Sequence, residues 1–387
     1  MKENLAVFTI YKDIYVLMHI KKQRAEHIFT YNSLEDLEIG TIINCRIDKQ
    51  STGIGSCFAA YSKDDTAFVP SEIKNGSVVP LVYKKEAYGG KKAVFSEKLS
   101  ICGEYIIYTD GDDHIKASSK ASEEKKNEYI SAFKKTSDPE NGNGIIIRTK
   151  AFEAEDGIEK ALSEYRLIKD KIEEIKRSSD HLKQYSILYR PLPAFVSDVL
   201  WLISEGIEEI VTDSPEIMEK LKYAHASLSG PVNLSDRVSL RFYEDELLSL
   251  CKLYSFDAKI SEALSRKVYL KSGAYVTFDH TEALWAIDVN SAKSDKKGER
   301  EDTFLAINTE AAREIARQLR LRNISGMVVI DFINMGRSEN YDRLKAVLTA
   351  ELAGDRTKCR FIDFTGMNLC ELIRDRQGHT LYSILGK

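Results

Sequence analysis

The distribution of apolar positions divides the chain into strand-rich and helix-rich stretches. Residues 5–20 alternate and cluster Val, Ile, Tyr and Leu, which predicts two short strands that turn at Lys12 and Asp13. Between residues 37 and 101, short β-branched runs are separated by Gly, Ser, Asn and Asp, and no helical period is present. This spacing predicts a small barrel or sandwich inserted in a larger fold.

The middle of the chain mixes helical and strand-like patterns. Apolar residues that recur at intervals of three and four predict helices over 121–134 and 155–176, with the strand-like run GIIIRT between them. The same reasoning predicts further elements in the next stretch: a helix around 196–203, a strand over 208–214, a helix over 215–224 and a helix over 257–265. From residue 266 onward, strands and helices alternate.

Two strand-like runs near the end of the chain each contain an aspartate, although a buried, unpaired carboxylate is costly. The first run is TEALWAIDVNS, where Asp288 and Asn290 share one face because successive side chains of a strand point to opposite faces. The second is GMVVIDFINM, where Asp331 lies opposite Ile330 and Phe332. Both aspartates are therefore expected to point away from the core.

A helical pattern over 302–322 connects these two runs, which predicts a strand–helix–strand crossover with both acids at one edge of a sheet. Two neighbouring carboxylates repel each other unless a cation lies between them, and oxygen ligands suit Mg²⁺. A single aspartate at a strand end is more often a turn former or a helix cap. The pattern alone leaves both interpretations open.

Composition and charge limit the classes of function. The chain of 387 residues has a formal net charge of -4, so an attraction to nucleic acid would have to come from local basic patches. Its six cysteines are far apart and form no CxxC motif, which is typical of a reduced intracellular protein. No signal peptide or membrane-spanning run is recognisable, so we expect a cytoplasmic protein without a membrane partner.

Several segments resemble the signature sequences of the bacterial ribonuclease E/G family. TEALWAIDVNS, NTEAAREIARQLRLRNISG and VVIDFINM occur in the family's order and with similar spacing, and the resemblance continues upstream through LSRKVYLKSGAYVTFDHTEAL and GIIIRT. It is weaker before residue 140. The resemblance implies a Mg²⁺-dependent endoribonuclease that cuts single-stranded, often AU-rich RNA during RNA processing and turnover, and that prefers a 5′-monophosphate end.

The resemblance also implies a mixed α/β fold of several subdomains. An RNase H-like unit would be interrupted by an S1 barrel of the OB type and by a 5′-sensor region, and a DNase I-like catalytic unit would follow. The implied ranges are 1–36 and 192–264 for the two halves of the RNase H-like unit, 37–101 for the S1 domain, 102–191 for the 5′-sensor region and 265–387 for the catalytic unit.

By the same resemblance, Asp288 and Asp331 hold one Mg²⁺, and Asn290 orients the attacking water or the scissile phosphate. The products would carry a 5′-phosphate and a 3′-hydroxyl. Whether Mn²⁺ replaces Mg²⁺ stays open. Asn334 stands where the family commonly has Asp, and Lys293 where it usually has Arg. Asn334 removes one negative charge near the implied metal, which is expected to weaken metal binding but leaves the two presumed ligands intact.

Arg148 and Thr149 match the family pair that binds the terminal 5′-phosphate, since a guanidinium offers a fork to phosphate oxygens and the hydroxyl adds a donor. Lys358 falls where an arginine usually completes that pocket. The compact ammonium charge of a lysine thus replaces a guanidinium that can bind two phosphate oxygens at once. Ser119 and Lys120 stand where the family has paired arginines. Both departures put strict sensing of the 5′ end in doubt.

In the implied barrel, Phe58 and Phe68 match positions on which RNA bases stack, and Lys91 matches a basic contact to the strand. This role predicts that both rings are exposed, whereas a phenylalanine in a short strand is more often part of the core. The chain ends after IRDRQGHTLYSILGK, before the cysteine pair through which ribonuclease E protomers share zinc. We therefore expect neither zinc nor a zinc-linked tetramer, and a monomer and a homodimer both stay open.

Two other classes of function stay in view. A diverged relative could bind RNA through the barrel and the sensor region without cutting it, as a ribosome-assembly or regulatory factor. The departures in the sensor region and at Lys293 favour this alternative. Clustered acids favour the enzyme, because a protein that only binds RNA has no need of groups that repel phosphate. A Mg²⁺-dependent DNase is disfavoured by the S1-like insertion.

Overall fold

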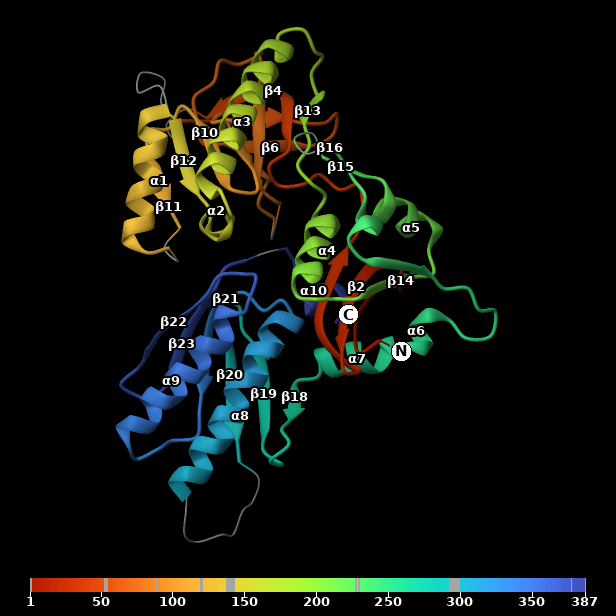
Figure 1. Cartoon of the computed structure of the whole chain (residues 1–387), viewed down its shortest axis with the longest axis vertical. Coiled ribbons are helices and arrows are strands. Elements are labelled where there is room, and N and C mark those ends of the chain that lie inside the picture. The colour runs from red at the N-terminus through yellow and green to blue at the C-terminus, as the bar shows by residue number, and fades with distance from the viewer. Residues whose placement is uncertain are drawn as a thin grey trace. The chain divides into compact units, whose positions relative to one another are not determined.

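The computed structural model describes residues 2–51, 55–87, 90–118, 121–136, 143–226, 228, 230–291, 300–376 and 378–386. Ser119, Lys120 and Lys293, three of the departures noted above, lie outside these ranges. The chain divides into two compact units (Figure 1). The first contains Met1–Leu34, Asp198–Leu221 and Leu234–Lys387, and the second contains Glu35–Ser197 and Lys222–Asn233.

A closed barrel of five strands forms one part of the second unit. Its strands are β4 (Ile42–Ser51), β5 (Ser56–Ala60), β6 (Thr66–Val69), β7 (Val78–Lys85) and β8 (Val94–Ser96). The order is β4-β5-β6-β8-β7, and β7 pairs again with β4, which closes the sheet. Alternate residues such as Cys57, Ala59 and Phe95 fill the interior. The small barrel predicted from the short β-branched runs is thus confirmed.

The rest of the second unit is a four-stranded sheet packed against helices. The sheet has the order β11-β12-β10-β9, and its strands are β9 (Ser100–Cys102), β10 (Ile106–Asp110), β11 (Ile115–Ala117) and β12 (Asn143–Ile147). The helices are α1 (Glu123–Thr136), α2 (Thr149–Glu153) and α3 (Gly157–Ser179). Tyr108, Phe133 and Tyr165 meet in the core between them. A short strand, β13 (Ile187–Tyr189), extends the barrel sheet by pairing with β4.

The first sheet of the first unit brings distant segments together in the order β17-β14-β1-β2-β3. Its strands are β1 (Asn4–Tyr11), β2 (Ile14–Lys21), β3 (Arg24–Tyr31), β14 (Glu209–Thr212) and β17 (Ser239–Phe242). The predicted turn at Lys12 and Asp13 is confirmed, since both residues have positive φ, as a tight hairpin turn requires. Lys22 and Gln23 form a second turn of this kind, which leads into β3, a strand that the sequence pattern did not reveal.

The chain also contains several short elements, of which the two strands within residues 224–232 belong to the second unit. They are α4 (Ala194–Ser204), α5 (Pro215–Lys222), β15 (Ala224–Ala226), β16 (Gly230–Val232), a 3-10 turn at Leu234–Asp236, α6 (Leu250–Leu253), α7 (Phe256–Leu264) and α10 (Leu381–Leu385). The helices predicted around 196–203, 215–224 and 257–265 correspond to α4, α5 and α7. Within the described ranges, every helix is too short or too polar to cross a membrane.

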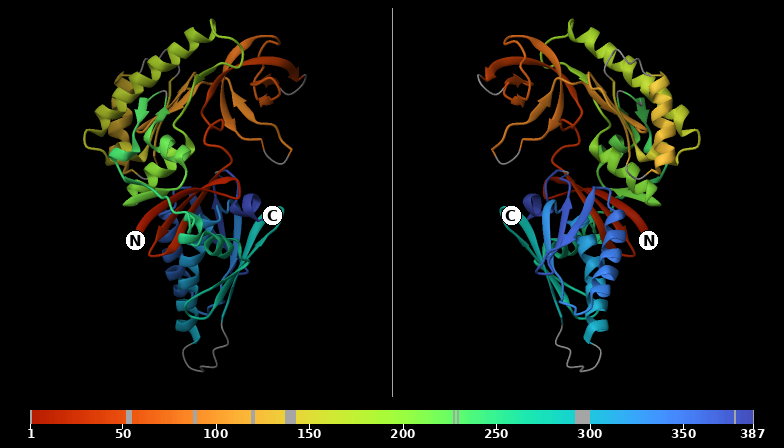
Figure 2. Two further views of the ribbon diagram at one scale, coloured as in Figure 1. Left: turned by 90° about the vertical axis from the view of Figure 1, so that its right-hand side faces the viewer. Right: turned by 90° about the vertical axis from the view of Figure 1, so that its left-hand side faces the viewer.

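The second sheet of the first unit has the order β18-β19-β20-β21-β23-β22. Its strands are β18 (Lys267–Tyr269), β19 (Tyr275–His280), β20 (Leu284–Asn290), β21 (Gly326–Asp331), β22 (Cys359–Phe364) and β23 (Cys370–Arg374). Helices α8 (Arg300–Leu321) and α9 (Ser338–Ala353) pack on one face, as Figure 2 shows, and bury a hydrophobic core there. Burial alternates along β20 and β21, so their other face carries exposed side chains.

Candidate functional site

Asp288 and Asp331 are direct register partners on the neighbouring parallel strands β20 and β21. Both side chains lie on the exposed face, while Ile287 and Ile330 beside them are buried against the helices. Neighbouring strands are separated by about 4.8 Å, and paired residues point to the same face. The structure therefore brings the two predicted acids together.

Asn290 extends this pair along β20. Its Nδ2 donates a hydrogen bond of 2.5 Å to Oδ2 of Asp288, two residues earlier on the same face. The bond uses one N–H of the Asn290 side-chain amide and fixes the orientation of the Asp288 carboxylate. The side-chain oxygen Oδ1 of Asn290 stays available as an acceptor. The structure thus groups all three predicted catalytic residues.

The crossover that brings the acids together depends on Asn308, a fully buried residue of α8. Its Nδ2 donates to the carbonyl oxygen of Ile333, and its Oδ1 accepts from the Ile333 N–H, at 2.8 and 3.0 Å. These two bonds hold the backbone two residues beyond Asp331 against the helix. This role was not predicted from the sequence, although Asn308 is a polar residue at the start of the apolar stripe NTEAAREIA, and such a position indicates a buried polar contact.

The donor set at this site fits a hard divalent cation. It consists of two carboxylates and an amide oxygen, with no thiolate or imidazole. Among the described residues, no group of three or more His, Cys, Asp or Glu side chains is placed to hold a metal. Mg²⁺ commonly uses one or two protein carboxylates and keeps several waters, so a pair of acids is sufficient for it.

Arg148 and Thr149 lie in the second unit, where β12 leads into α2. The Arg148 guanidinium donates from Nη1 to the carbonyl oxygen of Gly103, and its backbone N–H donates to the carbonyl oxygen of Tyr105 at 2.8 Å. The Thr149 hydroxyl lies 2.8 Å from that of Ser118. The side chain of Arg148 is exposed but oriented by the backbone of the β9–β10 loop.

Glu164 of α3 fixes this loop. Its carboxylate accepts three backbone hydrogen bonds, from the N–H groups of Glu104, Tyr105 and Ile106 at 2.6, 2.8 and 2.9 Å. A Cβ on Gly103 would lie 2.4 Å from the Glu164 carboxyl carbon, so a larger residue there would displace this carboxylate from the loop. The sequence analysis did not identify either residue, because the contact joins positions sixty residues apart.

Phe58 and Phe68 are register partners on β5 and β6, and their ring centroids lie 5.9 Å apart in an edge-to-face arrangement. Both rings are half-buried and point away from the barrel interior. The prediction that both rings are exposed was therefore too strong, because each ring covers part of the other. Lys91 is exposed.

The sequence profile of the Ribonuclease E/G family matches residues 100–377, which is most of the chain. This chain belongs to the ribonuclease E/G family. Ribonuclease E of Haemophilus influenzae is 31% identical over 330 residues, covering 83% of this chain and 34% of that protein. Ribonuclease E of Escherichia coli is 30% identical over 325 residues, covering 84% of this chain and 30% of that protein.

Ribonuclease G of Salmonella typhimurium is 28% identical over 385 residues, covering 90% of this chain and 74% of that protein. The chain thus spans about a third of the length of these two ribonuclease E relatives and about three quarters of ribonuclease G. The resemblance stated from the signature segments is confirmed at the level of the family.

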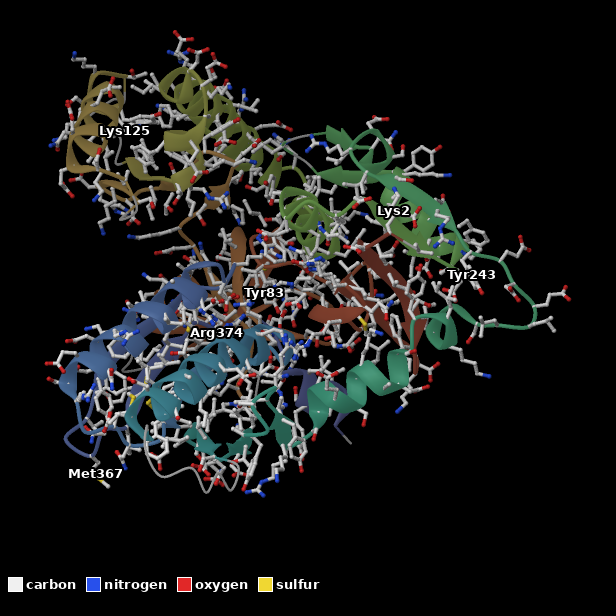
Figure 3. All side chains as sticks on the ribbon, turned by 60° about the horizontal axis from the view of Figure 1, so that its bottom comes forward. Lys2, Tyr83, Lys125, Tyr243, Met367 and Arg374 are labelled. Carbon is white, nitrogen blue, oxygen red and sulfur yellow. The ribbon has the colours of Figure 1, made fainter. Side chains whose placement is uncertain are left out.

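Two departures from the family pattern lie in the first unit. Asn334 is exposed three residues beyond Asp331, and its Oδ1 accepts a weak bond of 3.4 Å from Nδ2 of Asn368. Asn368 belongs to the turn between β22 and β23, next to Met367, which Figure 3 shows at the outer edge of the ribbon. Lys358 is exposed just before β22, and its carbonyl oxygen accepts from the N–H of Asp375.

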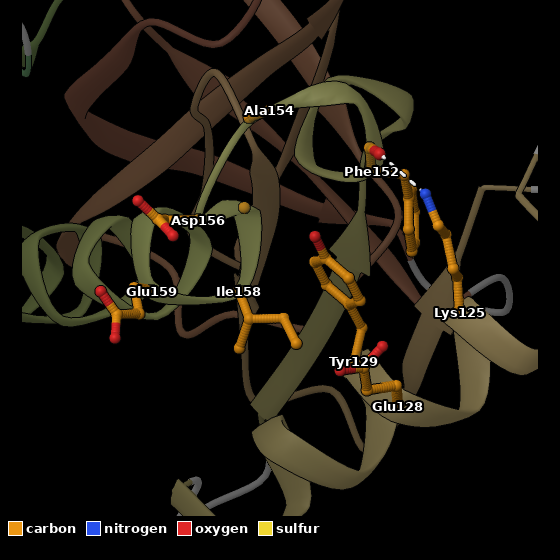
Figure 4. Close-up of a pocket in the computed structure, with 9 residues that line it drawn as sticks. Lys125, Glu128, Tyr129, Phe152, Ala154, Asp156, Ile158 and Glu159 are labelled. Carbon is orange, nitrogen blue, oxygen red and sulfur yellow. Dashed lines mark hydrogen bonds between the residues drawn. The ribbon is translucent and has the colours of Figure 1, made fainter.

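A shallow pocket of about 340 Å³ lies between α1 and the start of α3 in the second unit (Figure 4). Lys125 reaches across it to the carbonyl oxygen of Phe152. The charged lining is mainly acidic, with Glu128, Asp156 and Glu159 against this one lysine. None of the predicted site residues lines this pocket, and its charge disfavours the phosphates of a nucleic acid.

Proposed function

We propose that this member of the ribonuclease E/G family is a Mg²⁺-dependent endoribonuclease that cuts single-stranded, AU-rich RNA into products with 5′-phosphate and 3′-hydroxyl ends. The observation that carries the proposal is the direct pairing of Asp288 with Asp331 on one exposed sheet face. The names of the relatives support the activity, since each is a ribonuclease. RNA processing and turnover is the corresponding role.

Each residue of the site has a task in this proposal. Asp288 and Asp331 would hold Mg²⁺, which supplies polarisation of the scissile phosphate and a lower pKa for bound water. Asn290 keeps the Asp288 carboxylate in one orientation through its 2.5 Å bond. Its remaining donor and acceptor positions are available to orient the attacking water or a phosphate oxygen.

Binding of the RNA outside the reaction centre is assigned to residues of both units. Arg148 and Thr149, together with Lys358, would hold the 5′-terminal phosphate, and the backbone-anchored guanidinium of Arg148 supports this role. Phe58 and Phe68 would stack on bases. The S1, 5′-sensor, RNase H-like and DNase I-like subdomain names belong to this proposal as well, as does binding of the RNA strand by Lys91.

The test is cleavage of a labelled, AU-rich, single-stranded RNA that carries either a 5′-monophosphate or a 5′-hydroxyl, with Mg²⁺ or EDTA. We expect cutting by the wild type in Mg²⁺ and its loss in Asp288→Asn and in Asp331→Asn. Asp279→Asn is the matched control, because Asp279 lies on the same sheet face but is paired with Arg266. Retained cutting in both active-site variants would contradict the proposal.

A second candidate is a protein that binds RNA without cutting it. Lys358 favours it, because an ammonium group replaces the bidentate guanidinium of an arginine. Asn334 favours it as well, because an amide replaces an acidic side chain. Binding of the same RNA by the wild type, with intact RNA recovered in Mg²⁺ and in Mn²⁺, would establish this alternative in place of the nuclease.

A further inference from the structure

Three side chains form a compact cluster on the exposed face of the β18–β23 sheet. Lys267 and Tyr269 come from β18, and Tyr275 comes from the neighbouring strand β19. The Lys267 Nζ lies 3.4 Å from the centroid of the Tyr275 ring and 4.8 Å from that of Tyr269. The two ring centroids are 6.1 Å apart. We name these three residues the tyrosine–lysine cluster.

Strand register aligns this cluster with the candidate active site in two rows across the sheet. The first row contains, from strand to strand, Lys267, Thr277, Asp288 and Asp331. The second contains Tyr269, Tyr275 and Asn290. Paired residues point to the same face, and each strand step is about 4.8 Å. Tyr275 is thus the direct neighbour of Asn290, and Lys267 lies two steps, about 10 Å, from Asp288.

The tyrosine–lysine cluster does not belong to the core of the sheet. Val268 and Val276, which alternate with its members, are buried against the helices, whereas the Tyr269 side chain is 69% exposed. Tyr275 and Lys267 are half-buried by one another. Exposed aromatic surface beside a catalytic site is available to a ligand with flat faces.

Among the described residues of this face, Lys267 has no acidic partner for its charge. Within the described parts of the chain, Lys267 makes no ion pair, whereas the neighbouring Arg266 forms two bonds, of 2.5 and 2.7 Å, with Asp279. Asp288 and Asp331 stand in the same row and repel phosphates. A lysine in this row supplies the opposite charge where an RNA strand would approach.

We propose that the tyrosine–lysine cluster is a nucleotide subsite of the active site: one base of single-stranded RNA stacks on the exposed ring of Tyr269 and contacts Tyr275, whose ring plane is tilted by 56° against it, and Lys267 contacts a phosphate next to the scissile one. This inference rests on the function proposed above. Aromatic stacking accepts any base, so the subsite positions the strand without selecting its sequence. The positive charge of Lys267 beside the rings also attracts an approaching phosphodiester.

Steady-state cleavage and fluorescence anisotropy with the same single-stranded RNA test this subsite. For Tyr269→Ala and Tyr275→Ala we expect KM and the dissociation constant to rise roughly five- to a hundredfold, with kcat little changed. Tyr275→Phe keeps the ring and should restore binding. Tyr382→Ala is the control, since Tyr382 is 55% exposed on α10 of the same unit. Thermal unfolding of each variant reports whether it is folded.

The salt dependence of binding tests the role of Lys267 separately. Loss of one phosphate contact in Lys267→Gln should reduce the slope of log affinity against log salt by about 0.7, and Lys267→Arg should keep the slope. A purely structural lysine would leave the slope unchanged.

The outcomes separate the subsite from the nuclease. If the wild type cuts RNA while both alanine variants keep its KM and dissociation constant, the subsite is overturned and the nuclease stands. If the wild type binds RNA in a manner that depends on Tyr269 and Tyr275 but never cuts it, the nuclease fails and the subsite stands.

Discussion

Asn290 donates a hydrogen bond of 2.5 Å to the carboxylate of Asp288, which itself faces Asp331 across two parallel strands. A hydrogen-bonded partner of this kind restricts the rotation of a metal-binding carboxylate. In the proposed nuclease, cleavage is therefore expected to depend on Asn290 even if its amide makes no contact with Mg²⁺.

We predict that Asn290→Ala lowers RNA cleavage about 10- to 100-fold, the usual cost of losing a group that orients a metal ligand. The Mg²⁺ concentration for half-maximal activity should rise as well, because Asp288 then samples several rotamers. Initial rates measured over a range of Mg²⁺ concentrations check this. An unchanged Mg²⁺ dependence would show that Asn290 does not orient Asp288.

Glu164 is predicted to support recognition of the 5′ end. In Glu164→Ala, three backbone N–H groups lose their acceptor, and the loop that anchors Arg148 is released. We expect the free energy of unfolding to fall by about 1–3 kcal/mol. The ratio of cleavage rates for 5′-monophosphate and 5′-hydroxyl RNA should also approach one.

Glu174→Gln is the matched control for that experiment. Glu174 lies on the same helix but is exposed and pairs only with Lys171 among the described contacts. An exposed pair of this kind contributes little to stability. If Glu164→Ala preserved the 5′-end ratio of the wild type, the anchored loop would have no part in recognising the terminal phosphate.

Local patterns predicted much of the fold but not its long-range contacts. Alternation around Asp288 and Asp331 gave the correct face for both, because the period of a strand fixes which side chains point together. β3 was missed because its sequence, RAEHIFTY, mixes polar and apolar residues without a regular alternation. Several of its residues are partly buried because α8 and α10 pack against the strand. The Tyr269 and Tyr275 pair was missed because only strand register reveals that Tyr275 adjoins Asn290 and that Tyr269 adjoins Tyr275.

The buried ion pair of Asp355 and Arg374 is predicted to stabilise the first unit. The side chains are 3% and 4% exposed, their shortest contact is 2.8 Å, and Arg374, marked in Figure 3, also donates to Asn323 and to the Ile324 carbonyl. Asp355→Ala leaves a buried guanidinium without its carboxylate. We expect the free energy of unfolding to fall by about 3–5 kcal/mol, measured by urea denaturation.

The exposed pair of Arg266 and Asp279 provides the comparison on the same sheet. Its side chains are 71% and 45% exposed, so Asp279→Ala should cost at most about 1 kcal/mol. If Asp355→Ala and Asp279→Ala lowered the free energy of unfolding by equal amounts, burial would not explain the contribution of the Asp355 pair.

Two histidines, His19 on β2 and His27 on β3, are predicted to make the stability of the first unit depend on pH. His19 Nε2 lies 2.7 Å from Oδ1 of Asn4, and its Nδ1 lies 3.3 Å from Nδ1 of His27. Asn4 Oδ1 can only accept, so the proton of His19 lies on Nε2 and its Nδ1 is an acceptor. His27 therefore donates from its own Nδ1 to Nδ1 of His19. His27 Nε2 is then an unprotonated, buried nitrogen that has no partner among the described residues.

Burial lowers the pKa of His19 to about 4, and burial together with neighbouring positive groups lowers the pKa of His27 to about 2. Both values lie below the pKa of an unfolded histidine, about 6.5, so the unfolded chain binds more protons below that pH. The stabilisation is complete above pH 6.5 and is lost progressively as the pH falls. Once the pH is about one unit below 6.5 and still above the folded-state pKa, each histidine lowers the free energy of unfolding by about 1.4 kcal/mol per pH unit.

His27→Phe isolates the contribution of one of these histidines. A phenylalanine keeps an aromatic ring beside Trp201, whose centroid lies 4.7 Å from that of His27, but it cannot be protonated. Between pH 6 and 5, the variant should lose about 1.2 kcal/mol less stability than the wild type, as measured by urea denaturation at each pH. Parallel curves for the two proteins would mean that His27 is protonated in the folded state as readily as in the unfolded chain.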